Sequence, residues 1–243
     1  MATDELEFLE GLKDTYVFSD SPQDRTIKTL AMRTFRPFIR GPGPALELGC
    51  SDGFFTELIR GACADLTVVD GSKSFLDLSR ARVPDARFVY GLFEEFQPER
   101  PFDYIFASYI LEHVSDAVGL LRAIRSWLSP DGLLFLVVPN ARAQSRQLAQ
   151  HMGLIDDLYA LTPNDVNHGH RRVYDRVLLD RDVAASGLVT VASGGLMLKP
   201  FADFQMDALM KAGVVGPAQI EGLYRMGLAH PEFAGSLFSV CRA

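Results

Sequence analysis

The residues best suited to chemistry begin with segment 45–53, which reads ALELGCSDG. Glycines at positions 49 and 53 let the backbone turn sharply and approach a ligand closely. The apolar run LTVVD then ends in Asp70, about twenty residues beyond the glycine turn, where a carboxylate can accept both hydroxyl groups of an adenosine ribose. The loop and Asp70 together predict a cofactor that contains adenosine.

Charge separates the two cofactor classes that use this arrangement. A dinucleotide would place its anionic pyrophosphate over the loop, where Asp52 would repel it. S-Adenosylmethionine has no phosphate and carries two cationic groups against one carboxylate, so Glu47 and Asp52 are compatible with it. Ser51 also replaces the middle glycine of G-x-G-x-x-G, and no third glycine follows at the usual place. The loop therefore favours a methyltransferase over a nicotinamide-dependent oxidoreductase.

Three histidines are candidates for the general base that a hydroxyl acceptor would need. His113 follows the fourth predicted strand, and His168 and His170 lie in a later polar segment. For His113 a structural or cofactor-contacting role is the alternative. His168 and His170 with Asp165 also resemble a metal-binding pattern, but two histidines and one nearby acid are too common to predict a metal.

A group of arginines lies on either side of the expected acceptor site, and its members are Arg142, Arg146, Arg171, Arg172 and Arg176. Arginine side chains match carboxylates and phosphates well, so an anionic acceptor, an organic acid or a sugar carried on a nucleotide, fits the pattern. The alternative is that these arginines lie on solvated helix faces or pair with neighbouring aspartates.

Short apolar runs alternate with helical patterns along the chain, which indicates βαβ units and a mostly parallel α/β sheet. The expected strands are Ala45 to Gly49, Leu66 to Asp70, Arg87 to Tyr90, Tyr104 to Ser108, Leu133 to Val138, Leu188 to Ala192 and Leu237 to Cys241. Ligands of such sheets bind beyond the carboxyl ends of the strands. The acceptor site is therefore expected in the segment that follows the fifth strand.

One domain is expected for 243 residues. Ser21 and Pro22 read as the start of a helix that runs towards Ile39. We predict an N-terminal helical cap over 1–40, either a cover for the sheet or part of a lid, and a cofactor-binding core over 41–140. Two acceptor-side insertions follow, over 141–174 and 200–230, each with helical spacing.

These motifs, with the later segments FDYIFAS (102–108), LEHV (111–114) and LSPDG (128–132), occur in a recognisable order. The chain resembles the class I S-adenosylmethionine-dependent methyltransferases of the ubiquinone-biosynthesis-like group, best over 45–139. The resemblance implies a Rossmann-like doubly wound sheet of seven strands in the order 3-2-1-4-5-7-6, with the last strand antiparallel. It also implies that Glu47, Gly49 and Gly53 contact the aminoacyl part of the cofactor and Asp70 its ribose.

The chain departs from this family at the third strand, where Leu92 follows Gly91 in place of the acid that meets the adenine amine in many relatives. Leu92 and Phe93 could instead enclose the ring, or Phe93 could be a core aromatic. The predicted cofactor contacts are Glu47, Gly49, Cys50, Ser51, Gly53, Asp70, Gly71, Leu92, Phe93, Ser108 and His113. The predicted acceptor contacts are Tyr109, Asn140, Arg171, Arg172 and Tyr174, with no metal.

Composition limits the partners. The chain has 48% hydrophobic and 23% charged residues and a net charge of −7, so it lacks the basic surface that nucleic acid binding requires. Its three cysteines are scattered, and the sequence has neither a basic signal segment nor a membrane span, which predicts a cytoplasmic protein. The pattern does not predict an oligomeric state.

The leading hypothesis is therefore transfer of a methyl group to a small molecule, with S-adenosylhomocysteine as by-product. A hydroxyl of a sugar or a specialised-metabolism intermediate is the first choice of acceptor. N- or C-methylation, an NAD(P)-dependent oxidoreductase and a non-catalytic S-adenosylmethionine-binding protein are the alternatives.

Overall fold

A computed structural model describes residues 2–12 and 21–243. Met1 and residues 13–20 of the predicted cap lie outside the described residues. All seven predicted strands are present: β1 (Ala45–Leu48), β2 (Leu66–Asp70), β3 (Arg87–Tyr90), β4 (Phe102–Ser108), β5 (Leu128–Pro139), β6 (Val189–Leu198) and β7 (Ala234–Arg242). The first four agree closely with the predicted ranges, whereas β5, β6 and β7 are longer than predicted.

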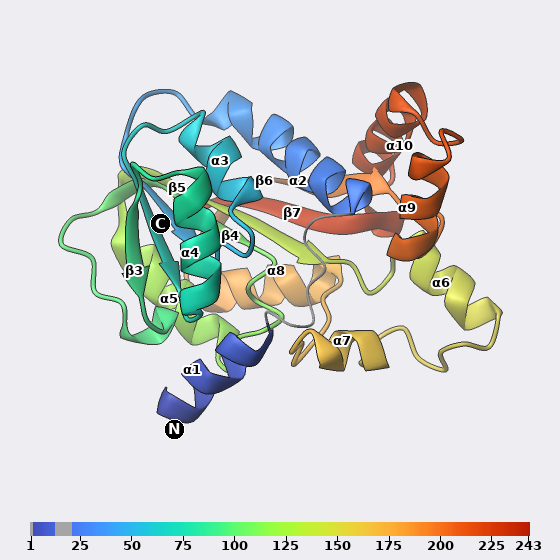
Figure 1. Ribbon diagram of the computed structural model, residues 1–243, viewed down its shortest axis with the longest axis horizontal. Helices are drawn as coiled ribbons and strands as arrows, with labels where there is room; N and C mark the ends of the chain where they lie inside the picture. Colours follow the sequence, from blue (N-terminus) through green and yellow to red (C-terminus); the bar gives the residue numbers. More distant parts are fainter. Residues whose placement is uncertain (1, 13–20) are drawn as a thin grey trace.

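The strands form a single sheet in the order β3-β2-β1-β4-β5-β7-β6, as the family resemblance predicts (Figure 1). The pairs among β1 to β5 are parallel, and β7 runs antiparallel to both β5 and β6. In β1, Glu47 pairs with Val68 of β2 on one side and with Phe106 of β4 on the other. The carboxyl ends of β1, β2 and β4 therefore meet at one edge, where a ligand is expected.

Helices cover both faces of the sheet (Figure 1). Their bounds are α1 (Ala2–Gly11), α2 (Pro22–Phe35), α3 (Phe54–Arg60), α4 (Lys73–Arg82), α5 (Ala117–Trp127), α6 (Gln144–His151), α7 (Pro163–Asn167), α8 (Arg176–Ala185), α9 (Asp203–Lys211) and α10 (Pro217–Ala229), with short 3₁₀ turns η3 (Arg36–Phe38), η4 (Phe93–Glu95) and η5 (Pro231–Phe233). No helix among the described residues is long and apolar enough to cross a bilayer.

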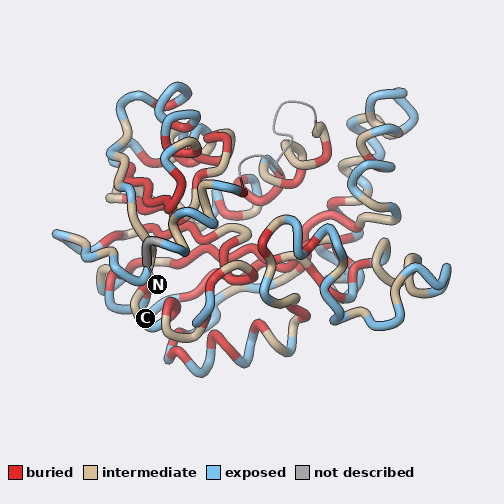
Figure 2. The backbone as a smooth tube through the Cα atoms, turned by 60° about the horizontal axis from the view of Figure 1, so that its bottom comes forward, coloured by how far each residue is buried: buried red, intermediate tan, exposed pale blue. Residues whose placement is uncertain are grey.

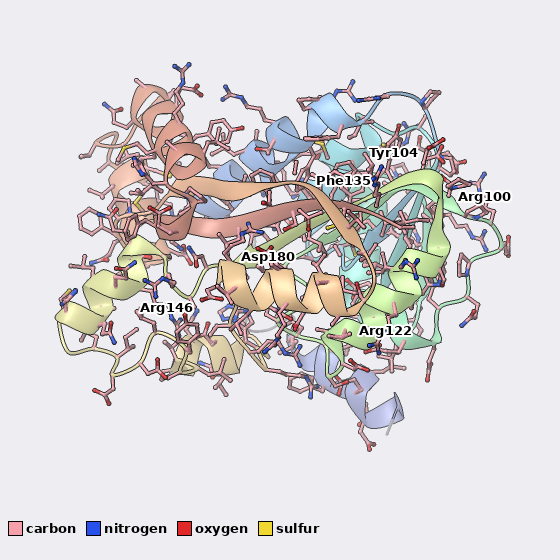
Figure 3. The ribbon with its side chains drawn as sticks, turned by 180° about the vertical axis from the view of Figure 1, so that it is seen from behind. Arg100, Tyr104, Arg122, Phe135, Arg146 and Asp180 are labelled. Atoms are coloured by element: carbon pink, nitrogen blue, oxygen red, sulfur yellow. The ribbon has the colours of Figure 1, made fainter. Side chains whose placement is uncertain are left out.

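Two buried clusters hold these layers together, one on each face of the sheet. Helices α5 and α8, which carry Arg122 and Asp180, lie over one face (Figure 3). On the other face Phe35 of α2 packs against Phe135 of β5 at a ring distance of 4.9 Å, and Phe106 of β4 stacks on Phe135 at 4.8 Å. Figure 2 shows the buried backbone concentrated along the strands. Truncating one such ring to alanine typically costs about 3–5 kcal/mol.

Local sequence fixes where α2 begins and where α1 docks. The Ser21 hydroxyl accepts a hydrogen bond from the Asp24 backbone N–H at 3.2 Å, and Pro22 occupies the first helical turn, as predicted. In α1, Glu10 accepts a hydrogen bond from the Ser72 hydroxyl at 2.8 Å, ahead of α4. The N-terminal helix is therefore attached to the loop that follows β2.

The predicted insertions contain α6 and α7 in 141–174 and α9 and α10 in 200–230. Helix α10 packs against β6, and α9 packs against α2. The second insertion is thus part of the layer that covers one face of the sheet.

Candidate functional site

The glycine loop between β1 and α3 has the strained backbone that its sequence indicates. Gly49 and Gly53 have φ angles of 75° and 78°, and Ser51, which is not glycine, has φ of 49°. A Cβ atom at Gly49 would lie 2.3 Å from Cδ1 of Ile110, and one at Gly53 would lie 2.6 Å from the Cα of Ser79. Both glycines are therefore required by backbone conformation and by neighbouring atoms, independently of any ligand.

Asp70 lies at the end of β2 and is only 7% exposed. Its two carboxylate oxygens accept hydrogen bonds from the backbone N–H groups of Cys50 and Ser72, each at 2.8 Å. Burial raises the pKa of this carboxyl, and these hydrogen bonds oppose the shift. Asp70 thus fastens the glycine loop to β2. Oδ1 retains a lone pair that could accept a ribose hydroxyl, whereas Oδ2 also accepts a weak hydrogen bond from the Cys50 thiol at 3.5 Å.

Glu47 lies on β1 with its side chain buried away from solvent. It is 1% exposed, and no described residue makes a hydrogen bond of good geometry to either carboxylate oxygen. Burial raises the pKa of Glu47 to about 8, while the neighbouring Thr56 hydroxyl opposes the shift. The hydroxyl of Ser108, at the end of β4, is also buried without a partner among the described residues. Both groups lie where the sequence predicts cofactor contacts.

Asp52 does not discriminate between cofactors as its sequence position suggested. Its carboxylate lies 3.4 Å from Arg82 and 3.7 Å from Arg25, and its backbone carbonyl accepts a 2.7 Å hydrogen bond from Arg82. Two cations therefore offset its charge, which weakens the argument that Asp52 would repel a pyrophosphate. The discrimination then depends on the glycine spacing.

The predicted adenine contacts, Leu92 and Phe93, lie after β3, next to the glycine loop. Leu92 precedes η4, and Phe93 in that turn packs against the core, with Cζ 3.7 Å from the place of a Cβ on Gly49. Gly71 lies under α1, where a Cβ would meet Leu9 at 2.4 Å. Helix α1 therefore covers the end of β2 next to Asp70.

The loop after β4 contains two of the predicted site residues, Tyr109 and His113. Tyr109 has φ of 60°, and its hydroxyl lies 2.9 Å from that of Ser236 on β7. A non-glycine residue in this conformation is often found at functional sites. Burial and the neighbouring His170 lower the pKa of His113 to about 3, so its imidazole is neutral.

Glu112, which the sequence did not single out as a site residue, lies in the same loop. It is 1% exposed, and neither carboxylate oxygen accepts a hydrogen bond from another described residue. Burial raises its pKa to about 7, and the neighbouring His170 opposes the shift.

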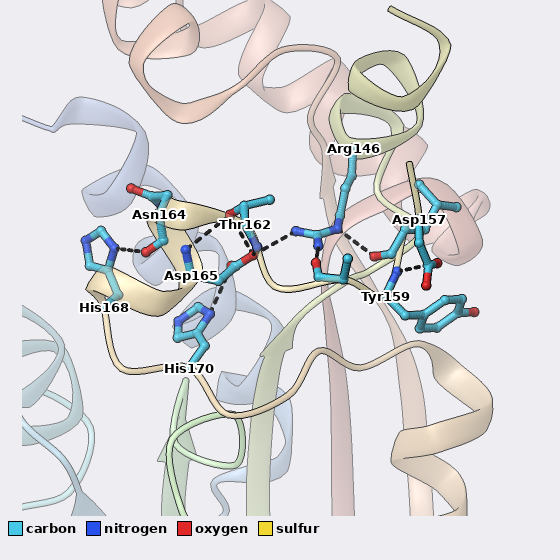
Figure 4. Close-up of polar contacts among 10 residues, drawn as sticks. Arg146, Asp157, Tyr159, Thr162, Asn164, Asp165, His168 and His170 are labelled. Atoms are coloured by element: carbon cyan, nitrogen blue, oxygen red, sulfur yellow. Dashed lines mark hydrogen bonds and ion pairs between the residues drawn. The ribbon is translucent and has the colours of Figure 1, made fainter. Parts of the chain in front are cut away.

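The insertion after β5 places His170 and His168 in different environments (Figure 4). Nδ1 of His170 lies 3.1 Å from Oδ1 of Asp165, whereas Nδ1 of His168 lies 2.8 Å from the Asn164 carbonyl. The rings of His113 and His170 are 4.8 Å apart and nearly perpendicular. The structure therefore brings His113 and His170 together, and His168 lies beside α7.

Asp165 organises this insertion. It accepts hydrogen bonds from the backbone and hydroxyl of Thr162, and Arg146 lies 3.1 Å from the same carboxylate (Figure 4). Burial alone would raise its pKa, but the hydrogen bonds from His170, Thr162 and Arg146 outweigh burial and hold the pKa well below its usual range.

The predicted acceptor contacts other than Tyr109 make hydrogen bonds or ion pairs within the protein. Arg171 donates to the His113 carbonyl at 2.7 Å and pairs with Glu5 at 2.6 Å. Arg172 donates to the carbonyls of Leu111, Val114 and Ser115. Their guanidinium groups therefore brace the loop after β4, and acceptor binding by them remains a prediction.

Asn140 and Tyr174 are also engaged within the protein. The Asn140 amide donates to two backbone carbonyls, at 3.1 and 2.8 Å, in the segment that leads into β7. The Tyr174 hydroxyl donates to Asp182 at 3.1 Å, and this residue is 1% exposed. An isolated parallel β-bridge joins Asn140 and Tyr174 just after the end of β5.

Comparison with known proteins identifies the family. Residues 22–193 match the model of a methyltransferase domain. A trans-aconitate 2-methyltransferase of Enterobacter sp. (strain 638) is 36% identical over 97 residues, which are 39% of this chain and 38% of that protein. One from Methylobacterium radiotolerans is 31% identical over 124 residues, 50% of this chain and 48% of that protein. The matches thus span less than half the length of these relatives.

Solved structures share the fold at low sequence identity. The N-methyltransferase NodS from Bradyrhizobium japonicum WM9, in complex with S-adenosylhomocysteine, aligns with a TM-score of 0.60 at 16% identity over 98% of this chain and 96% of that one. The plantazolicin methyltransferase BpumL, in complex with the same molecule, aligns with a TM-score of 0.62 at 14% identity over 98% and 97%. The ubiquinone-biosynthesis-like subgroup stays a prediction. With the match over 22–193 and the predicted sheet order, the chain belongs to the methyltransferase-domain family, the class I S-adenosylmethionine-dependent methyltransferases.

Proposed function

We propose that this chain binds S-adenosylmethionine at the carboxyl ends of β1, β2 and β4 and methylates a small molecule there. One observation carries the proposal. Among the described residues, the buried side-chain oxygens without a hydrogen-bond partner all belong to Glu47, Ser108 and Glu112. These residues lie on, or directly after, the neighbouring strands β1 and β4. Buried polar groups are rarely unpaired, so their concentration here indicates a ligand.

The donor set fits this cofactor. Glu47 is an acceptor for a cationic group, Ser108 can donate or accept, and Oδ1 of Asp70 retains capacity for a ribose hydroxyl. Leu92 and Phe93 provide apolar surface for an adenine ring. When bound, S-adenosylmethionine supplies an electrophilic methyl group attached to sulfur.

The chain's own contribution is position. A methyl transfer gains most from holding the acceptor in line with the methyl group and away from water, and such orientation can supply roughly 7–11 kcal/mol. The rigid glycine loop, the strained Tyr109 and the braced loop after β4 are suited to this task. A hydroxyl acceptor would also need a proton acceptor, for which His113, His168 and His170 are the candidates, and the pKa of about 3 makes His113 a weak base.

For the acceptor we favour an oxygen atom of an organic acid. The similar proteins named trans-aconitate 2-methyltransferases support this class, although the matched stretches are short. A sugar hydroxyl, the first choice from sequence, and N- or C-methylation remain alternatives, and a soluble, cytoplasmic enzyme remains the expectation.

Calorimetry with S-adenosylhomocysteine and with NAD⁺ tests the cofactor. We expect the first to bind and the second not to bind. Incubation with S-adenosylmethionine and a panel of polycarboxylates, sugars and amines, followed by mass spectrometry, then tests the acceptor. Glu99→Ala, an exposed change that loses only a pair with Arg87, is the control and should behave like the wild type. Binding of NAD⁺ without S-adenosylhomocysteine would overturn the proposal.

A further inference from the structure

Glu112, His113 and His170 converge on one point although they come from two distant segments. Each offers one possible ligand atom, and these atoms all lie within 4.8 Å of one another. The backbone N–H of Arg171 donates to the Glu112 carbonyl at 2.7 Å. This bond joins the insertion to the loop after β4, so the main chain fixes the approach of the three side chains.

No described side chain forms a hydrogen bond or an ion pair with the Glu112 carboxylate, and the nearby Arg172 acts on it through charge alone. This carboxylate is buried. The two arginines nearest in sequence direct their guanidinium groups elsewhere, Arg171 to Glu5 and the His113 carbonyl and Arg172 to loop carbonyls. A carboxylate in this position normally requires a cation or several donors.

His170 makes the kind of side-chain contact that metal-binding histidines make. Its Nδ1 lies 3.1 Å from Asp165, which Thr162 and Arg146 hold in place. When Nδ1 donates its proton to that carboxylate, Nε2 carries a lone pair. Histidines that bind metals typically donate their other ring N–H to a carboxylate or a carbonyl in this way.

We propose that Glu112, His113 and His170 bind a divalent transition-metal ion. Two imidazole nitrogens and one carboxylate oxygen suit Zn²⁺ or Fe²⁺ and disfavour Mg²⁺ and Ca²⁺, which prefer oxygen ligands. Three protein ligands leave positions open for oxygen atoms of the acceptor. This last role rests on the proposed function.

The sequence analysis predicts no metal because His168, His170 and one nearby acid, Asp165, form a pattern that is too common to indicate one. The structure assigns Asp165 to the outer position, behind His170, and supplies Glu112 as the acid of the cluster. His168 is not part of the cluster.

Direct metal binding tests the proposal. Full-length protein is treated with a chelator, dialysed and titrated with Co²⁺ alone and with Zn²⁺ alone, using visible absorption for Co²⁺ and calorimetry for both. We expect one equivalent of each to bind. Glu112→Gln and His170→Ala should weaken binding by about 100-fold or more, and Asp165→Asn by about 10- to 100-fold, as for outer-shell partners. His151→Ala, an exposed histidine at the end of α6, is the matched control and should bind metal like the wild type.

The outcomes separate this proposal from the proposed function. Circular dichroism confirms that each variant is folded, and the wild-type titration decides the question even if Glu112→Gln is not. Failure of the wild type to bind either ion, or equal losses in His151→Ala and His170→Ala, would overturn the metal site. S-Adenosylhomocysteine binding is measured on the same metal-free protein. If S-adenosylhomocysteine binds but no metal does, only the metal site is wrong. If S-adenosylhomocysteine fails to bind both with and without metal, the cofactor proposal fails.

Discussion

At the scale of single residues, the site consists of acidic groups that the fold isolates from water. Glu47 is the clearest case, because its carboxylate is buried on β1, inside the sheet, without a hydrogen bond of good geometry from a described residue. Such a group destabilises the folded chain whenever it is ionised. A buried carboxylate of this kind is expected where the residue serves a cationic ligand.

The pKa of Glu47 gives a prediction with a definite sign. Burial raises this pKa from 4.5 to about 8, so the folded protein binds the proton more tightly than the unfolded chain does. The stability that Glu47 contributes is therefore fully present below pH 4.5 and is lost as the pH rises through about 8. In Glu47→Gln this loss should be absent, which urea denaturation across the same pH range will measure.

The affinity for the cofactor should rise with pH, whereas the stability falls. The ammonium group of S-adenosylhomocysteine favours ionised Glu47, so wild-type affinity should increase as the pH approaches 8, with release of a proton that calorimetry in two buffers can detect. Glu47→Gln should bind about 10- to 100-fold more weakly at the upper end of that range. Equal affinity of the two proteins throughout would remove Glu47 from the cofactor site.

Sequence alone could identify residues whose role is carried by a local pattern. The glycine turn and Asp70 are of this kind, since both follow from a strand, a loop and a spacing. The contact of Ile110 with Gly49 and that of Asp165 with His170 depend on side-chain placement in three dimensions. The spacing of residues along the chain does not predict such contacts. For the same reason, the sequence identifies Glu112 only as part of the family motif LEHV and not as a site residue.

At the scale of elements, the first insertion is attached to the sheet edge by arginine side chains. Arg172 donates to three carbonyls of the loop after β4, and Arg171 to a fourth. Carbonyls that no helix or strand satisfies need such donors. The arginines at 171 and 172 therefore give this loop its shape, a role that their sequence positions alone could not distinguish from acceptor binding.

We predict that Arg172→Ala lowers the free energy of unfolding by about 1.5–3 kcal/mol, because charged hydrogen bonds to carbonyls are lost. Arg172→Lys should recover little of it, since one ammonium cannot reproduce the planar geometry of a guanidinium. Arg225→Ala, which loses an exposed pair with Glu221, should change the stability by less than about 1 kcal/mol. If Arg172→Ala keeps full stability and only the acceptor KM rises, the side chain serves the acceptor after all.

The elements themselves were predictable to different degrees. Apolar runs bounded by turns predicted all seven strands. Those covered on both faces, such as β1 and β2, are continuously apolar, whereas β3 and the start of β6 are largely exposed and were recognised from their short β-rich runs. The end of β6 was missed, since its SGGL segment reads as a turn although it pairs with β7. The order of strands came from the resemblance to a family, because strand periodicity contains no information about which strands are neighbours.

At the scale of the whole molecule, charge decides how an anionic acceptor would approach. The chain carries a net charge of −7. The arginines around the first insertion, which suggested a basic site, are engaged with acids or carbonyls: Arg146 with Asp165, Arg171 with Glu5, Arg176 with Asp180. Their fields are therefore partly cancelled at a distance, and the approaching anion meets the repulsion of the entire chain.

Salt should consequently speed the reaction of an anionic acceptor. Screening shortens the range of electrostatic repulsion to about 10 Å at 0.1 M ionic strength, so kcat/KM for a polycarboxylate should rise by about two- to tenfold between low and physiological salt. A neutral acceptor of similar size, assayed at saturating S-adenosylmethionine, should show no such change and is the control. A kcat/KM that falls with salt for the anion alone would instead indicate a net positive field at the entrance, and would return Arg171 and Arg172 to the role of acceptor ligands. The direction of this slope thus separates arginines that hold a loop from arginines that attract a substrate.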